Sequence, residues 1–184
     1  MSESQNHVKE IILKQQPIYK GRIVDLSVVD VQLPDGKTSQ REIVKHPGAV
    51  AIVALDPDQR VVLVRQYRTA AERILLEIPA GTLNPGEDPL VCAERELQQE
   101  TGFFPGKLVS LGGIFVAPGY TTEYIHLFVA NDLRASRLAA DDDEFIEVSH
   151  VPLAEALAMI ERGEICDGKS VAGLLRVALQ YKAG

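Results

Sequence analysis

The sequence has no tryptophan, only two cysteines and no uninterrupted apolar run long enough to cross a membrane. Because a membrane-spanning helix needs about 18 or more consecutive apolar residues, we expect no membrane partner. The N-terminal residues 1–14 are too polar to contain the apolar segment of a secretion signal. Two cysteines, Cys92 and Cys166, are too few for a disulfide framework. We therefore expect a cytoplasmic protein whose thiols are reduced.

Basic residues are also relatively scarce, and this bears on the class of ligand. The 184 residues include 19 Lys and Arg against 26 Asp and Glu, a formal net charge of −7. Nucleic-acid binding usually needs a broad basic surface, so no nucleic-acid partner is expected. A small anionic substrate would need local help from a metal ion or a few arginines. The length suits one domain, or one domain with a small extra lobe.

The first part of the chain is predicted to be mostly antiparallel β structure. Residues 1–14 are expected to form a loose polar start. Alternating apolar residues then predict strands, and Pro34-Asp35-Gly36 is typical of a hairpin turn. The expected strands are residues 18–33, 41–45, 49–55 and 61–67.

One helix is marked clearly by residues at both of its ends. Asp88 is suited to cap its first turn, Pro89 to occupy the first helical position, and Gly102 to end it. Further strands are expected at 108–112, 124–130 and 145–151, and further helices at 152–162 and 170–182. Strands on both sides of a helix, followed by helices, predict an α+β domain in which a mixed sheet lies between helical layers, an α/β/α sandwich.

Two glutamates in this helix are candidates for metal ligands. Glu96 and Glu100 are four residues apart, so their side chains project from one face. A divalent cation between them would remove their mutual repulsion, and carboxylate oxygens favour Mg²⁺ or Mn²⁺ over zinc. Taken alone, the same spacing also fits a solvated acidic helix face.

The surrounding segment is far more specific than two glutamates. Residues 81–103 read GTLNPGEDPLVCAERELQQETGF, which resembles the Nudix box. The positions that match are Gly81, Glu87, Arg95, Glu96, Leu97, Glu100, Gly102 and Phe103. The resemblance implies a Nudix fold and a pyrophosphatase. It further implies that Glu96, Glu100 and the carbonyl of Ala80 hold the metal, and that Arg95, paired with Glu87, orients the box carboxylates.

One position departs from the family pattern. Gln99 stands where the family usually has a first glutamate of an adjacent pair, which often serves an auxiliary metal ion. A neutral amide cannot supply a charged metal ligand. Gln99 is either a natural variation that costs one metal ion or some rate, or an engineered change that traps a substrate, and the sequence leaves both explanations open.

Segments outside the box resemble the ADP-ribose pyrophosphatase and nucleoside-diphosphate-sugar branch of the family. They include residues 64–68 (VRQYR), residues 77–81 (EIPAG) and a proline 15 residues beyond Phe103. The resemblance implies that Arg68 binds phosphate or ribose, as a planar guanidinium can. The implied substrate-binding residues are Arg68, Glu77, Pro118 and Gly119.

The general base is expected in the acidic segment 141–147. Residues 143–148 (DEFIEV) resemble the loop and strand that carry the catalytic glutamate of this branch, which makes Glu144 the first choice. Asp142 and Asp143 are the alternatives. With Glu96 and Glu100, Glu144 completes the predicted catalytic set.

The N-terminal strands are expected to form a separate lobe. We divide the chain into an N-terminal β lobe, residues 1–45, and a Nudix catalytic domain, residues 46–184. Because such strands exchange between subunits in this branch, the resemblance implies a homodimer. Two alternatives to ADP-ribose hydrolysis stay open: a pyrophosphatase for GDP-mannose or a dinucleotide, and a Nudix-fold nucleotide sensor without turnover.

Overall fold

The computed structural model of the protein describes residues 7–136, 138–139 and 145–182. Its internal contacts divide the chain into two compact units. One comprises the residues up to Pro47 together with Ala117–Glu123, and the other comprises Gly48–Val116 and the residues from Tyr124 onward. The contacts thus add the segment Ala117–Glu123 to the N-terminal part of the chain. The division at residue 45 that the sequence suggests remains a proposal about domains.

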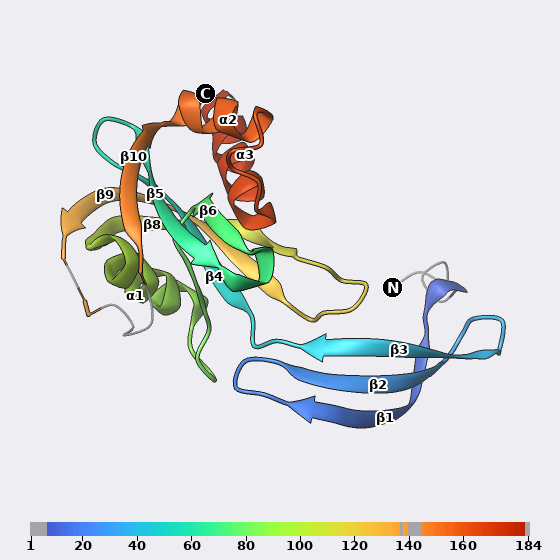
Figure 1. Ribbon diagram of the computed structural model, residues 1–184. Coiled ribbons are helices and arrows are strands. Elements are labelled where there is room, and N and C mark those ends of the chain that lie inside the picture. Colours follow the sequence, from blue (N-terminus) through green and yellow to red (C-terminus); the bar gives the residue numbers. More distant parts are fainter. Residues whose placement is uncertain (1–6, 137, 140–144, 183–184) are drawn as a thin grey trace. The chain divides into compact units, whose positions relative to one another are not determined.

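The first unit is a three-stranded antiparallel sheet in the order β1-β2-β3 (Figure 1). Its strands are β1 (Ile11–Lys20), β2 (Asp25–Gln32) and β3 (Thr38–Lys45). The turn between β2 and β3 contains Gly36 at φ 87°, a conformation that favours glycine. The segment Ala117–Glu123 is held to β3, where the Val44 N–H donates to the Tyr120 carbonyl at 2.7 Å.

The prediction that residues 1–14 form a loose start was wrong from Ile11 onward. β1 begins at Ile11, which is paired with Gln32 of β2. All ten residues of β1 are exposed. Because this strand is held by backbone pairing and buries neither face, its sequence lacks the apolar alternation that predicts a half-buried strand.

The second unit is built on a seven-stranded mixed sheet with the central order β10-β5-β4-β9-β8 (Figure 1). β4 pairs with β9 in parallel and with β5 and β7 antiparallel. The short strands β6 and β7, which the sequence patterns missed, pair with β5 and β4. The strands are β4 (Ala49–Leu55), β5 (Arg60–Arg68), β6 (Arg73–Glu77), β7 (Ala80–Thr82), β8 (Phe103–Phe115), β9 (Tyr124–Ala135) and β10 (Glu147–Pro152).

Helices cover both faces of this sheet, as predicted. They are α1 (Pro89–Thr101), α2 (Leu153–Glu161) and α3 (Gly168–Lys182). Every residue of β4 is buried, and successive side chains of a strand point to opposite faces. Val50 and Ile52 pack in the cluster that contains α1 residues, whereas Ala51 and Val53 pack in the cluster that contains α2 and α3 residues. The unit is therefore an α/β/α sandwich.

The ends of α1 are those predicted from its sequence. The Asp88 carboxylate accepts a hydrogen bond from the Leu90 N–H at 2.8 Å, and Pro89 begins the helix. Gly102 ends it at φ 76°, donating to the Gln98 carbonyl. Among the described residues, no helix has both the length and the apolar character needed to cross a membrane.

Candidate active site

The two candidate metal ligands of α1 lie against the backbone of β7. Glu96 and Glu100 are one turn apart, and their exposed fractions are only 9% and 6%. The Ala80 N–H donates to the Glu100 carboxylate at 2.9 Å. A Cβ atom placed on Gly81 would lie 1.9 Å from the carboxyl carbon of Glu96. The absence of a side chain at Gly81 therefore makes the space that the Glu96 carboxylate fills.

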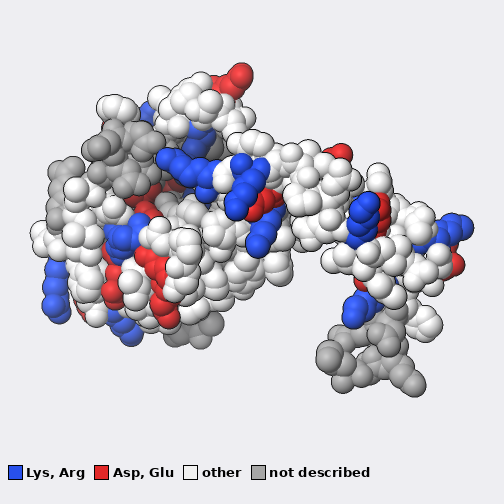
Figure 2. Space-filling model, turned by 90° about the horizontal axis from the view of Figure 1, so that it is seen from below, with Lys and Arg blue, Asp and Glu red and all other residues white. Residues whose placement is uncertain are grey.

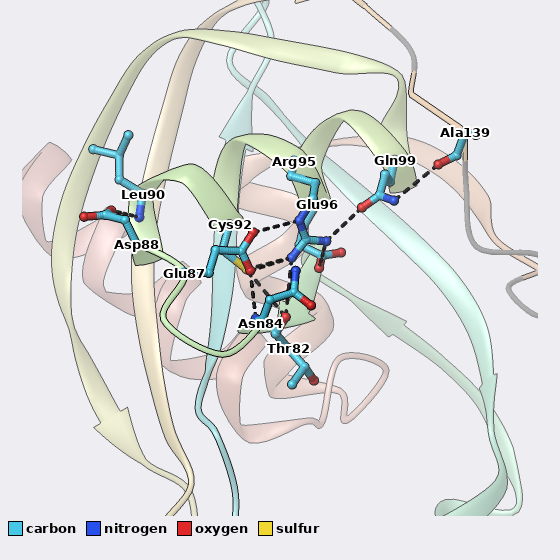
Figure 3. Close-up of polar contacts among 10 residues, drawn as sticks. All are labelled: Thr82, Asn84, Glu87, Asp88, Leu90, Cys92, Arg95, Glu96, Gln99 and Ala139. Carbon is cyan, nitrogen blue, oxygen red and sulfur yellow. Dashed lines mark hydrogen bonds and ion pairs between the residues drawn. The ribbon is translucent and has the colours of Figure 1, made fainter. Parts of the chain in front are cut away.

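Arg95 connects three side chains of the box (Figure 3). Its guanidinium donates two hydrogen bonds to Glu87, at 2.9 and 3.0 Å, so the predicted pairing of these residues is present. It also donates to Glu96 at 2.5 Å and to the Gln99 side-chain oxygen at 2.9 Å. Because one planar group fixes three partners at once, Arg95 orients the polar face of α1 without having to meet a substrate.

The Glu87 carboxylate closes the turn that precedes α1. It accepts from the Asn84 N–H at 2.8 Å as well as from Arg95. The hydrogen bond from Arg95 lowers the pKa of Glu87 to about 2, although burial acts in the opposite direction. The same pairing with Glu87 raises the pKa of Arg95. Both groups are therefore charged at neutral pH.

Gln99 uses both ends of its amide. Its oxygen accepts from Arg95, and its nitrogen donates to the Ala139 carbonyl at 3.3 Å (Figure 3). A glutamate at this position could still accept from Arg95, but it has no proton to donate to a carbonyl. The departure from the family pattern thus adds a link between α1 and the segment that follows β9.

The predicted substrate-binding residues Arg68 and Glu77 are paired with each other. The Arg68 guanidinium donates to both carboxylate oxygens of Glu77, at 2.9 and 2.8 Å. Glu77 is only 1% exposed and also accepts from Lys169. Burial alone would raise the pKa of Glu77, but the hydrogen bonds and charges of Arg68 and Lys169 outweigh it and lower the pKa.

Arg68 also lies within electrostatic reach of the box. Its pKa is raised first by the hydrogen bond with Glu77 and further by the charges of Glu100 and Asp167. The structure therefore places the Arg68–Glu77 pair near the carboxylate of Glu100. Two of the four predicted substrate-binding residues thus lie in the same unit as the box.

The first turn of α3 contributes residues that sequence reasoning missed. Asp167 accepts from both the Lys169 ammonium and the Ser170 N–H, at 2.8 and 3.2 Å. The Ser170 hydroxyl accepts a buried hydrogen bond of 2.8 Å from the Ile78 N–H. The Asp-Gly-Lys-Ser sequence at 167–170 could have been read as a helix cap. This local sequence does not predict its partners Glu77 and Ile78, which lie about 90 residues earlier in the chain.

The other two predicted substrate-binding residues and the predicted base lie elsewhere in the chain. Pro118 and Gly119 are exposed residues of the N-terminal unit, in the segment Ala117–Glu123. Glu144 and its alternatives Asp142 and Asp143 lie outside the described residues. Their roles remain predictions.

The two cysteines are both free and differ sharply in environment. Cys92 is buried on α1, and burial raises the pKa of its thiol to about 12. Cys166 is exposed, and its sulfur accepts from Arg73 at 3.0 Å. Burial keeps the Cys92 thiol protonated, and Cys166 contacts a guanidinium, so among the described residues neither cysteine has the arrangement of an activated nucleophile.

The arrangement of Glu96 and Glu100 fits a hard divalent cation. Among the described residues, no group of three His, Cys, Asp or Glu side chains could hold a metal ion. Structural zinc sites in proteins usually have four such ligands. Mg²⁺ is instead commonly held by one or two carboxylates together with water and substrate phosphates. Two buried carboxylates beside the backbone of β7 match the second pattern.

Comparison with known proteins identifies the family. The NUDIX domain profile matches residues 45–173, most of the chain. The chain belongs to the Nudix family. The Nudix proteins most similar to it include the ADP-ribose pyrophosphatase of Bacillus subtilis (strain 168), which is 41% identical over 95% of this chain and 92% of its own length. A methanol dehydrogenase activator of Bacillus methanolicus is 45% identical over 94% and 92%.

A solved structure supports the same assignment. The crystal structure of an ADP compounds hydrolase superposes with a TM-score of 0.85 at 27% identity, covering 95% of each chain. The expected Nudix fold is thereby confirmed over almost the whole length. Figure 2 shows acidic side chains interspersed with basic ones among the described residues of the face in view.

Proposed function

We propose that this Nudix protein hydrolyses the pyrophosphate of ADP-ribose or a related nucleoside diphosphate sugar, giving a nucleoside monophosphate and a sugar phosphate. The observation that carries the proposal is the pair of buried carboxylates, Glu96 and Glu100, fixed against Gly81 and Ala80. Similarity to an ADP-ribose pyrophosphatase over 95% of the chain supports the choice of substrate.

Glu96, Glu100 and the Ala80 carbonyl would hold Mg²⁺ or Mn²⁺. When bound, the metal supplies neutralisation of the phosphate charge and polarisation of phosphorus. Arg95 keeps the Glu96 carboxylate in place, and the Ala80 N–H does the same for Glu100. Arg68, oriented by Glu77, binds the phosphate or ribose from the side.

Proton removal from the attacking water falls to Glu144 in this proposal. General-base catalysis needs a carboxylate within hydrogen-bond reach of the water. The Asp143-Glu144-Phe145-Ile146 sequence supports the assignment through its resemblance to this branch of the family. Pro118 and Gly119 are proposed as further substrate-binding residues because their segment resembles this branch of the family.

Product release from ADP-ribose, ADP-glucose, GDP-mannose and NADH, measured with and without Mg²⁺, tests the proposal. Metal-dependent AMP formation from ADP-ribose is the expected result. Preferential cleavage of GDP-mannose or of the dinucleotide NADH would support the same hydrolytic reaction with a different preferred substrate. Tight binding of ADP-ribose without cleavage would instead identify a nucleotide sensor.

We also propose that the protein is a cytoplasmic homodimer. β1 exposes several large apolar side chains, which a second subunit would cover: Ile11, Ile12, Leu13, Ile18 and Tyr19. Sedimentation velocity at micromolar concentration should give a dimer, and Ile12→Lys should weaken it. A monomer at all accessible concentrations would contradict this part of the proposal.

A further inference from the structure

The buried carboxylate of Glu77 binds two cations, Arg68 and Lys169, and Lys169 also binds the Asp167 carboxylate. Arg68 donates two parallel hydrogen bonds to it, and Lys169 donates a third. Since Glu77 is 1% exposed, its charge is largely removed from water. A buried carboxylate that loses its counter-charge is strongly destabilised. Because Lys169 also binds Glu77, Arg68 is not the sole cation that this buried carboxylate depends on.

The two cations differ in their surroundings. The Arg68 side chain is 41% exposed, whereas that of Lys169 is only 12% exposed. Lys169 is also bound to the Asp167 carboxylate at 2.8 Å, at the start of α3. A guanidinium has five N–H donors, of which Glu77 occupies two of those on Arg68. Arg68 is thus exposed enough to contact a ligand, whereas Lys169 is mostly buried.

We propose that Lys169 is the permanent counter-ion of Glu77 and thereby leaves the charge of Arg68 available to the diphosphate of an anionic nucleotide. Lys169 is a positioning residue, since it acts through Glu77 and Arg68 and not on the ligand. Without it, Arg68 alone would balance Glu77, and sharing Arg68 with a phosphate would leave a buried carboxylate poorly compensated. The ligand class rests on the proposed function.

The location of this cluster supports a role at the site. Arg68 lies within electrostatic reach of Glu100, one of the two proposed metal ligands. The α3 turn that carries Lys169 is anchored to the same backbone, through the hydrogen bond between Ser170 and Ile78. The turn that carries Lys169 is consequently held beside Glu77 by this hydrogen bond.

Calorimetric binding of ADP-ribose in EDTA tests the proposal without turnover. Lys169→Met should weaken binding by about tenfold or more, the scale expected for a lost charge interaction. Lys169→Arg, which keeps the charge, should bind more tightly than Lys169→Met. Lys107→Met, at an exposed position of β8, is the matched control and should bind normally. With Mg²⁺, Lys169→Met should raise KM and leave kcat within about threefold.

A double variant separates this role from simple loss of structure. Glu77→Gln combined with Lys169→Met removes the carboxylate together with its counter-ion, so Arg68 no longer has a charge to balance. The double variant should bind within about threefold of Glu77→Gln alone, because Lys169 then has no carboxylate at position 77 to balance, whereas a general packing defect would weaken binding in both backgrounds. If Lys169→Met alone does not fold, the charge-balanced double variant still decides the question.

Two results would overturn the role of Lys169. One is normal ADP-ribose affinity in folded Lys169→Met, and the other is a folded double variant that binds about tenfold or more weaker than Glu77→Gln alone. Wild-type protein that binds ADP-ribose but does not cleave it would contradict only the proposed hydrolysis. Wild-type protein that does not bind ADP-ribose would contradict both proposals.

Discussion

The carboxylate of Glu96 lies directly against the α-carbon of Gly81, in space that any other residue would fill. A methyl group on Gly81 would meet the carboxyl carbon at 1.9 Å and its two oxygens at 2.1 and 2.3 Å. The glycine of the box thus makes room for the side chain of a glutamate that lies 15 residues later in the sequence. This gives a physical reason for the glycine at the start of the box.

Gly81→Ala should impair catalysis more than folding. The clash is with the far end of a flexible side chain, so Glu96 can move while the backbone stays. Displacement of a reacting group by about 1 Å can cost about 100-fold in rate, and we expect a loss of kcat/KM of that order. Mn²⁺ affinity, measured by electron paramagnetic resonance, should fall with it. Gly168→Ala, where a Cβ would meet nothing within 4 Å, is the control.

The Arg95–Glu87 pair predicts a defined pH dependence of stability. The pKa of Glu87 is lowered from 4.5 to about 2, so its pairing stabilises the folded state above the unfolded-state pKa. That contribution should disappear as pH falls from about 4.5 to about 2. Denaturant unfolding of the wild type and of Glu87→Gln should differ by a constant amount above about pH 5.5 and converge below it. A difference that grows on acidification would contradict this assignment.

Loss of the hydroxyl should have different effects on stability at two serines whose hydroxyl oxygens are buried. Ser170→Ala leaves the buried Ile78 N–H without its acceptor and should cost about 1–3 kcal/mol. Ser149→Ala removes a buried hydroxyl that has no hydrogen-bond partner among the described residues, so its effect should lie within about 0.5 kcal/mol. Urea denaturation measures both. Equal losses of stability in the two variants would show that the hydrogen bond between Ser170 and Ile78 does not account for the effect.

The identity of residue 99 should control the metal requirement. Gln99→Glu places a charged oxygen beside Arg95 and removes the donor to the Ala139 carbonyl. We expect the Mg²⁺ concentration for half-maximal rate to fall, or turnover to rise, because a further carboxylate can serve a metal ion. Titration of the rate with Mg²⁺ measures this, with Gln98→Glu on the same helix for comparison. No change in either quantity would show that glutamine at position 99 impairs neither turnover nor the response to Mg²⁺.

Glu144→Gln tests the choice of general base. Loss of a general base usually lowers kcat by about two to four decades, and the metal site should be unaffected. Single-turnover rates at saturating Mg²⁺ and the Mn²⁺ affinity of the variant measure the two effects. Asp142→Asn and Asp143→Asn are the comparisons. A near-normal rate for Glu144→Gln would move the role to another residue.

Local signals in the sequence predicted the local structure well. Asp88, Pro89 and Gly102 define α1 through interactions within a few residues, and the helix begins and ends where they place it. Glu96 and Glu100 face the same side because their spacing matches the helical period. Neither of these conclusions needs knowledge of the rest of the fold.

Contacts between distant segments could not be predicted in the same way. Arg68 and Glu77 were each expected at the site, but their mutual pairing depends on the register of β5 and β6. Lys169 and Ser170 reach Glu77 and Ile78 only because α3 packs on the sheet. β1 was missed for a related reason, since its pairing with β2 leaves no pattern of burial in its own side chains.

The contrast between the two cysteines makes the protein suitable for labelling without any mutation. Cys92 is inaccessible and its thiol stays protonated, whereas Cys166 is open to solvent. A maleimide dye should therefore attach at Cys166 alone, next to Asp167 and three residues from Lys169. If nucleotide binds at the Arg68–Glu77 pair as proposed, the fluorescence of this dye should change when nucleotide is added.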